Sequence, residues 1–364
     1  MVVDDSIVAR RLLTRWIGAE PDMMIAACLR TGREAVDQLV DGDPDVVVLD
    51  VDMPELDGIS ALPLLLEKKR ELVVIMSSAL TRRGAEVTLR ALSLGAADYV
   101  PKPEAAANAA TSALFHRELI DKIRILGRRG RLLTPQAGKR GVPRELPGQQ
   151  RETAAPGATP AFALRPFARG APRALLIGSS TGGPQALSVL IGEIAGALGP
   201  APILITQHMP PTFTTVLAEH LTRVSGKPVR EGEHGEAVAP GGIYVAPGGR
   251  HMRVVPGRDG PAIALGDDPP INFCKPAVDP LLSSAAKVWG AGSLALVLTG
   301  MGNDGTGGAA AIAAAGGSVI VQDETTSVVW GMPRSVAQAG LCSAILPLGQ
   351  IAEKVKGLFA GQRS

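Results

Sequence analysis

The chain has 364 residues, of which 46% are apolar but only 3% aromatic, and it carries a net charge of +2 at neutral pH. This length gives room for two domains, and the abundance of small aliphatic residues favours layered α/β packing over a β-sandwich. No run of about 18 apolar residues could span a bilayer, no signal peptide opens the chain, and the three cysteines form no C-x-x-C pair. We therefore expect a cytoplasmic protein without membrane insertion, disulfides or a zinc site.

Residues 1–126 alternate strand and helix patterns, which is typical of a parallel α/β sheet. Functional groups in such sheets lie at the carboxyl ends of the strands. Strands are expected at 1–3, 45–49, 72–76 and 98–100.

Polar side chains follow these strands. Asp4 and Asp5 come after the first expected strand. Asp50 ends the apolar run Val46-Val47-Val48-Leu49 of the second. Carboxylates suit a hard cation such as Mg²⁺, and a carboxylate beside the cation can attack a phosphoryl group and hold it as an acyl phosphate. Ser77 and Lys102, at the ends of two further strands, are placed to contact that group.

This segment resembles a response-regulator receiver domain with a flavodoxin-like fold, through the motifs Val3-Asp4-Asp5-Ser6, Leu49-Asp50-Val51-Asp52-Met53-Pro54, Ser77-Ser78 and Lys102-Pro103. The resemblance implies that Asp50 accepts a phosphoryl group from a chemotaxis histidine kinase. It also implies that Mg²⁺ is shared by Asp4, Asp5 and Asp50. The receiver switch would consist of Ser77, Tyr99 and Lys102, with Lys102 paired to the phosphate.

Residues 127–173 form a Pro/Gly/Arg-rich segment without apolar periodicity. Between 128 and 173 there are ten Lys and Arg against two Glu, which leaves 27 basic and 33 acidic residues elsewhere. The segment predicts a flexible basic linker. The rest of the chain offers no dominant basic patch, so we expect no nucleic-acid partner.

Residues 174–360 again predict a doubly wound, mostly parallel α/β domain. The sequence of residues 229–265 is rich in Gly and short β-like runs, which predicts a small antiparallel excursion beside the main sheet. Main-sheet strands are expected at 174–177, 203–206, 242–246, 294–298, 318–321 and 344–346.

A small-residue turn follows the first of these strands. Gly178-Ser179-Ser180-Thr181-Gly182 matches G-x-S-x-G, the pattern that exposes a nucleophilic serine between a strand and a helix. The glycines permit a tight turn, and the start of the helix provides free N–H groups and a positive dipole for an oxyanion. By itself this pattern is common and weak.

A nucleophilic serine needs a base, and the base needs an acid to orient it. Among five histidines, His208 follows a buried strand and is favoured. His251, in a tight turn after Gly249, is the alternative. Asp304 lies just past another buried strand, so Ser180, His208 and Asp304 are expected at one edge of the sheet.

The second domain resembles the catalytic domain of the chemotaxis-specific protein-glutamate methylesterases. The matching motifs are Ile177-Gly178-Ser179-Ser180-Thr181-Gly182-Gly183, Gln207-His208-Met209-Pro210, Ala246-Pro247-Gly248-Gly249-Arg250-His251-Met252, Leu298-Thr299-Gly300-Met301-Gly302-Asn303-Asp304-Gly305 and Gln322-Asp323-Glu324.

The resemblance implies hydrolysis of glutamate methyl esters, and deamidation of glutamine, on the cytoplasmic helices of chemoreceptors. Ser180 would be the nucleophile, His208 the base and Asp304 the orienting acid. The backbone N–H groups of Thr181 and Met301 would form the oxyanion hole, and no cofactor is expected for the ester chemistry. Phosphorylation of the receiver would relieve its occlusion of the cleft.

Two alternatives remain open at this point. Gly300-x-Gly302-x-x-Gly305 follows a strand and precedes a helix, as in dinucleotide-binding enzymes, and Asp323 lies near the position of a ribose-binding acid. Against this, Asp304 would place a negative charge beside the pyrophosphate. The second alternative is a non-catalytic response regulator that only binds partners.

Overall fold

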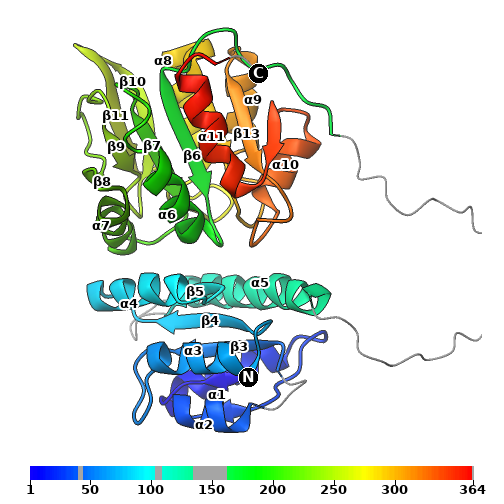
Figure 1. Cartoon of the computed structure of the whole chain (residues 1–364). Coiled ribbons are helices and arrows are strands. Elements are labelled where there is room, and N and C mark those ends of the chain that lie inside the picture. Colours follow the sequence, from blue (N-terminus) through cyan, green and yellow to red (C-terminus); the bar gives the residue numbers. More distant parts are fainter. Residues whose placement is uncertain (40–43, 103–108, 134–161, 363–364) are drawn as a thin grey trace, which may run out of the picture.

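The computed structural model describes residues 1–39, 44–102, 109–133 and 162–362 and folds them into two α/β units, each with its own parallel sheet (Figure 1). We refer to residues 1–133 as the N-terminal unit and to residues 162–362 as the C-terminal unit. Among the described residues, no helix is long and apolar enough to cross a membrane.

The sheet of the N-terminal unit has five parallel strands in the order β2-β1-β3-β4-β5. Both β3 and β4 are buried along their whole length, as their continuous apolar runs require. The direction of the connections reverses between β1 and β3, so the ends of these two strands form the crevice of the sheet. The strands are β1 (Val2–Val3), β2 (Cys28–Leu29), β3 (Val46–Asp50), β4 (Val73–Ser78) and β5 (Asp98–Pro101).

Helices cover both faces of this sheet, α1 and α5 on one and α2, α3 and α4 on the other. Four of the helices begin at a side-chain N-cap, a Ser, Thr or Asp whose oxygen accepts a hydrogen bond from the first turn. The helices are α1 (Ile7–Gly18), α2 (Gly32–Gln38), α3 (Gly58–Lys68), α4 (Arg82–Ser93) and α5 (Ala109–Leu133).

The sheet of the C-terminal unit has seven parallel strands in the order β14-β13-β12-β6-β7-β9-β8. Here the connections reverse between β6 and β12, which again defines a crevice at the carboxyl ends of the strands. The expected α/β class is thus confirmed for both units. The strands are β6 (Ala174–Ser179), β7 (Ile203–Gln207), β8 (Val229–Glu231), β9 (Ile243–Val245), β12 (Ser293–Val297), β13 (Ser318–Gln322) and β14 (Ala344–Leu346).

Alternate residues of the central strands point to two separate cores. Leu175 and Ile177 pack with α6, α7 and α11, whereas Leu176 packs with α8, α9 and α10 on the other face. The helices are α6 (Gly183–Ile194), α7 (Phe213–Ser225), α8 (Val278–Trp289), α9 (Thr306–Ala314), α10 (Met332–Gln338) and α11 (Leu348–Phe359), with a 3₁₀ turn at Gly290–Gly292.

The antiparallel excursion expected within residues 229–265 is present in part. Strands β10 (His251–Gly257) and β11 (Gly260–Gly266) form a separate two-stranded antiparallel sheet. The expectation is wrong for β8, which joins the main sheet by parallel pairing with β9. With only three residues, β8 is too short for its sequence to show a strand period.

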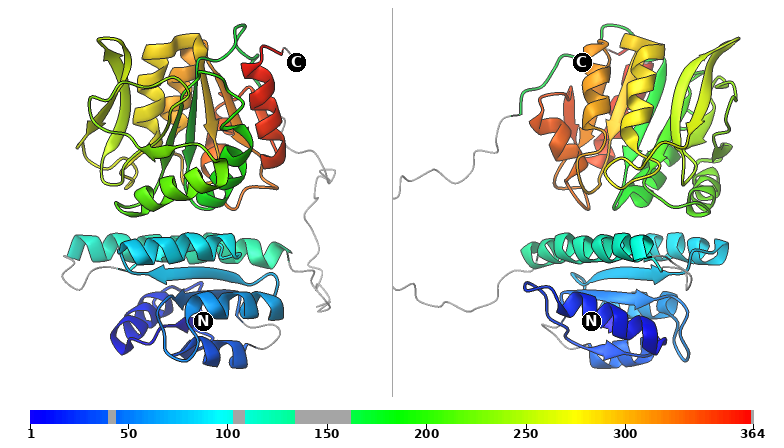
Figure 2. Two further views of the ribbon diagram at one scale, coloured as in Figure 1. Left: turned by 60° about the vertical axis from the view of Figure 1, so that its left-hand side comes forward. Right: turned by 180° about the vertical axis from the view of Figure 1, so that it is seen from behind.

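The two units contact each other through α4, β5 and α5 of the N-terminal unit, which face the C-terminal unit in both views of Figure 2. Tyr99 of β5 stacks on Phe213 at the start of α7, with ring centroids 5.0 Å apart and an interplanar angle of 9°. Arg82 of α4 pairs with Glu219 of α7 at 2.8 Å. The Gln185 amide of α6 donates to the carbonyl of Ala96 at 3.2 Å.

The segment expected to link the domains, residues 127–173, is shorter in the structure. Helix α5 continues to Leu133, and residues 162–173 already contact the C-terminal unit. The backbone of Arg165 pairs with Cys342, and Phe162 packs edge-on against Trp330. The remaining linker, residues 134–161, lies outside the described residues.

Candidate active site

Ser180 occupies the tight turn between β6 and α6. Its N–H donates to the carbonyl of Thr299 at 3.0 Å, and its carbonyl accepts from the N–H of Gly183 at 2.7 Å. Gly182 caps α6 with a φ of 74°, a left-handed conformation that favours glycine. The turn therefore places Ser180 at the carboxyl edge of the sheet, beside the start of a helix.

His208 follows β7, the strand next to β6. Its backbone N–H donates to the carbonyl of Ser179 at 3.1 Å, which holds the two strand ends together. The side chain is 9% exposed, and its Nε2 lies 2.7 Å from Oδ2 of Asp304. Burial acts to lower the pKa of His208, but Cys274 and Asp304 beside the ring outweigh burial and raise this pKa to about 10.

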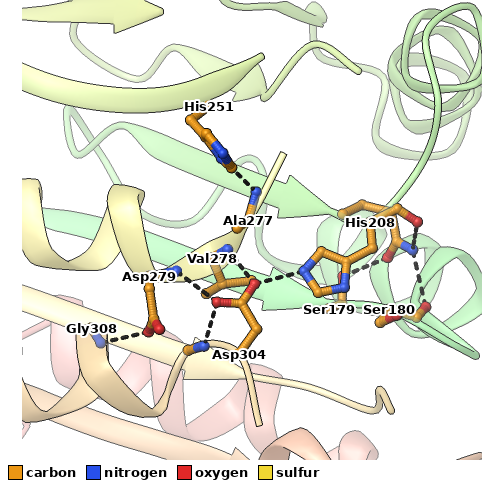
Figure 3. A network of polar contacts seen from close by, with 11 residues as sticks. Ser179, Ser180, His208, His251, Ala277, Val278, Asp279, Asp304 and Gly308 are labelled. Atoms are coloured by element: carbon orange, nitrogen blue, oxygen red, sulfur yellow. Dashed lines mark hydrogen bonds and ion pairs between the residues drawn. The ribbon is translucent and has the colours of Figure 1, made fainter. Parts of the chain in front are cut away.

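Asp304 follows β12, on the other side of β6. Its carboxylate is 2% exposed and accepts backbone N–H groups from Val278 at 2.6 Å, Asp279 at 3.0 Å and Gly305 at 2.9 Å (Figure 3). Burial acts to raise the pKa of Asp304, but the hydrogen bonds from His208 and from the backbone hold it below its ordinary value. The carboxylate is thus ionised and fully engaged.

These three residues line one cleft of about 630 Å³, which also includes Thr181 and Met301. The far wall of the cleft belongs to the N-terminal unit and includes Tyr99, Arg117, Glu118, Asp121 and Lys122. Within the part of the chain that the structure describes, no hydrogen bond joins the Ser180 hydroxyl to the His208 ring, which instead has Cys274 as its second neighbour.

Two residues of this site received no role from the sequence. Gln207, the last residue of β7, is 2% exposed and bonds to the backbone of both Ser180 and His208. Cys274 lies in the segment after β11 and reaches the cleft. The position of Gln207 beside His208 was a usable signal, whereas nothing in the local sequence of Cys274 pointed to the site.

The alternative base, His251, is buried and lies apart from Ser180 (Figure 3). Its Nδ1 accepts from the N–H of Ala277 at 3.1 Å, so Nε2 donates to the carbonyl of Pro269 at 3.1 Å. Both ring nitrogens are therefore engaged with the backbone. His251 positions the segment that leads into α8 and cannot accept a proton from Ser180.

The dinucleotide alternative receives no support from the loop between β12 and α9. The carboxylate of Asp279 accepts from the N–H of Gly308 at 2.6 Å in the first turn of α9, where a pyrophosphate would have to bind. Asp304, within the same glycine motif, is ionised and buried beside it. Two carboxylates at this helix start oppose a bound anion.

A second cluster lies in the crevice of the N-terminal sheet. Asp4, Asp5 and Asp50 each offer a carboxylate oxygen within 4.8 Å of the others. The Lys102 ammonium lies 2.9 Å from Asp4 and 2.7 Å from Asp50. Burial raises the pKa of Asp50 to about 6, although Lys102 acts to lower it. The oxygen donors suit a hard cation.

The remaining predicted residues of this unit take different positions. Ser77, the residue before the end of β4, lies beside Asp50 in the sheet register, and its buried hydroxyl has no hydrogen-bond partner among the described residues. Tyr99 lies instead at the contact with the C-terminal unit, stacked on Phe213. The structure thus brings Ser77 and Lys102 to the acidic cluster and places Tyr99 at the cleft.

Comparisons with known proteins match each unit to a protein family. The model "CheB methylesterase" matches residues 175–355, and the model "Response regulator receiver domain" matches residues 1–113. A protein-glutamate methylesterase/protein-glutamine glutaminase of group 2 operon from Rhodopseudomonas palustris is 58% identical over 370 residues, covering 100% of this chain and 95% of its own length. A relative from Nitrobacter hamburgensis is 58% identical over 364 residues, covering 100% and 94%.

Among solved structures, the CheB methylesterase catalytic domain of Thermotoga maritima is similar to this chain, with a TM-score of 0.50 and 42% sequence identity. The match covers 51% of this chain and 98% of that domain. The chain therefore belongs to the family of protein-glutamate methylesterases/protein-glutamine glutaminases, with a response-regulator receiver domain followed by a CheB methylesterase domain.

Proposed function

We propose that this chain hydrolyses glutamate methyl esters on the cytoplasmic helices of chemoreceptors and deamidates glutamine there by the same chemistry. The observation that carries the proposal is the convergence of Ser180, His208 and Asp304 in one cleft. A hydroxyl, an imidazole and an oriented carboxylate are the groups that acyl transfer needs. The names of the relatives support the ester and the amide as substrates.

The orientation of the His208 ring assigns the proton transfers. Because the ionised Asp304 carboxylate can only accept, Nε2 of His208 carries a proton in both charge states of the ring, and Nδ1 has a lone pair once the ring is neutral. The ring lies between Asp304 and the turn that contains Ser180 (Figure 3). Nδ1 is therefore the group that takes the proton from the Ser180 hydroxyl.

The reaction then proceeds in two acyl-transfer steps. Ser180 Oγ attacks the ester carbonyl, and the C–O bond to the methoxy group breaks as His208 returns the proton to departing methanol. Water, deprotonated by His208, attacks the acyl-enzyme and releases glutamate and Ser180. Each tetrahedral intermediate places its negative oxygen at the N–H groups of Thr181 and Met301. These steps use no cofactor, and with a glutamine substrate the leaving group is ammonia.

The N-terminal unit supplies the regulation in this proposal. Asp50 would accept a phosphoryl group from a histidine kinase, Asp4, Asp5 and Asp50 would hold Mg²⁺, and Lys102 would pair with the phosphate. The orphaned hydroxyl of Ser77 fits a site for the new phosphate oxygens. The cation, when bound, offsets the negative charge of the carboxylates and of the phosphoryl group.

The contact between the units supports inhibition in the unphosphorylated state. Met301 packs in one apolar cluster with Phe115 and Leu119 of α5. Arg117 of α5 lies 4.3 Å from the ring centroid of Phe273 at the rim of the cleft. A receptor helix cannot reach Ser180 while α5 forms the far wall of the cleft. Phosphorylation of Asp50 would weaken this contact between the units and so open the cleft. We propose that the enzyme acts in the cytoplasm.

The catalytic role of Ser180 is tested by Ser180→Ala beside Asp50→Ala. We expect Ser180→Ala to lower methanol release from methylated receptor by at least about 10³-fold, with or without a phosphodonor. Asp50→Ala should keep the basal rate and lose activation. In the parent protein, a fluorophosphonate should label Ser180, located by mass spectrometry. Normal methanol release by Ser180→Ala would contradict the proposal and favour a partner-binding regulator.

The inhibitory role of the contact is tested by a charge swap at its exposed ion pair. Arg82→Glu places a negative charge against Glu219 and should raise basal hydrolysis about two- to fivefold, because an exposed pair contributes at most about 1 kcal/mol. The double variant Arg82→Glu/Glu219→Arg restores the attraction and should return the rate to the parent value. The rate of the fully phosphorylated protein should stay the same in both variants. A double variant as active as the single one would argue against docking.

The protonation of His208 is tested by the pH dependence of basal hydrolysis. A base must be neutral to accept a proton, so a pKa raised to about 10 leaves activity low at neutral pH and lets it rise as the pH approaches that value. Cys274→Ser removes one of the two groups that raise the pKa of His208, so the rise in activity should occur at lower pH. Rates are corrected with Ser180→Ala at each pH, and identical profiles for parent and variant would contradict the assignment.

A further inference from the structure

We infer that Gln207 is a positioning residue of this catalytic centre, which orients the Thr181 N–H of the oxyanion hole by fixing the peptide bond before it. The inference rests on the proposed function, because it assigns a means of stabilising the negative oxygen of the acyl-transfer intermediates. It concerns a buried amide to which neither the sequence nor the relatives assign a role.

The Gln207 side chain connects the ends of β6 and β7. Its Oε1 accepts from the Ser179 hydroxyl at 2.7 Å, and its Nε2 donates to the carbonyl of Ser180 at 3.0 Å and to that of His208 at 3.3 Å. The side chain is 2% exposed. A Cβ on Gly183 would collide with its Oε1, so the amide packs directly against the first residue of α6.

The hydrogen bond to the Ser180 carbonyl sets the direction of the next N–H. In a planar trans peptide the C=O and the following N–H point in opposite directions. With the Ser180 carbonyl held by Gln207 and by the N–H of Gly183, the Thr181 N–H points the other way. Among the described residues this N–H has no acceptor of its own, as a donor kept for an oxyanion requires.

The second donor of the proposed oxyanion hole is held in the same manner, but by backbone alone. The carbonyl of Gly300, which precedes Met301, accepts from the N–H of Gly331 at 3.1 Å and of Met332 at 2.8 Å. Each N–H of the pair is thus oriented by two donors to the carbonyl before it. Among the described residues, only the carbonyl before Thr181 is held by a side chain, so a side-chain substitution at Gln207 removes one of its two donors.

An isosteric substitution separates donation from packing. Gln207→Glu keeps the shape and can still accept from Ser179, but its carboxylate cannot donate to the Ser180 carbonyl and repels it. Removing one oxyanion donor costs about 10²–10³-fold in kcat. Because the donor here is misaligned and not removed, we expect kcat to fall about 10- to 100-fold. KM should change little, because the donor stabilises the negative oxygen of the transition state and not the bound substrate.

The pH dependence provides a readout that a merely structural role would not move. When the introduced carboxyl takes a proton, its O–H can donate to the Ser180 carbonyl again. The ratio of the variant's kcat to that of the parent should therefore rise as the pH falls. Gln207→Met has a similar shape but no donor at any pH, so it should show the same loss with a constant ratio.

The experiment uses the full chain with a phosphodonor and measures methanol release from methylated receptor across pH, together with thermal unfolding of each variant. Ser179→Ala is the matched control, since it removes only the donor to Oε1, and we expect it to lower kcat less than about threefold. If Gln207→Glu fails to fold, Gln207→Met alone tests the loss of kcat.

The inference is overturned if a folded Gln207 variant keeps kcat within twofold of the parent, or if Gln207→Glu and Gln207→Met show the same pH-independent ratio. Labelling of Ser180 in the parent by a fluorophosphonate is scored separately. Its absence would overturn the proposed function itself, whereas its presence with an unimpaired Gln207 variant would remove only the positioning role.

Discussion

The proposed catalytic arrangement depends on one buried negative charge, the carboxylate of Asp304. Removing a carboxylate from water is costly unless hydrogen bonds replace the lost solvent. Here the replacement comes from the N–H groups of Val278 and Asp279, which belong to the first turn of α8, and from Gly305. The helix start therefore stabilises the charge that in turn orients His208. Without it, the imidazole would have no fixed tautomer.

The parallel sheet brings this charge to the other two residues. His208 and Asp304 are 96 residues apart in the chain but 2.7 Å apart in space, because the strands before them flank β6 on its two sides. Connections leave these strands toward opposite faces, so the crevice between β6 and β12 stays open. The same principle places Asp4 and Asp50 together in the N-terminal sheet.

Much of this arrangement could be predicted from the sequence, since buried parallel strands appear as continuous apolar runs and polar residues at their ends share one edge. What failed were the features set by long-range packing. The three-residue strand β8 carries no period of its own, and α5 extends beyond the expected boundary. The sequence shows Gln207 only as a polar residue at a strand end beside His208. Its three partners become visible only when β6 and β7 lie side by side.

In the proposed regulation, the site that would receive phosphate and the surface that covers the cleft share one short strand. Lys102, which pairs with Asp50, directly follows β5, and Tyr99 within β5 stacks on Phe213. Phe213 opens α7, just after the turn that begins at His208. A phosphoryl group on Asp50 would compete with the carboxylates of Asp4 and Asp50 for the Lys102 ammonium. Its first effect would therefore be on the end of β5, which Lys102 directly follows. The face of the N-terminal unit that contacts the C-terminal unit is therefore well placed to respond to phosphorylation, because β5 provides the Tyr99 contact and leads directly to Lys102.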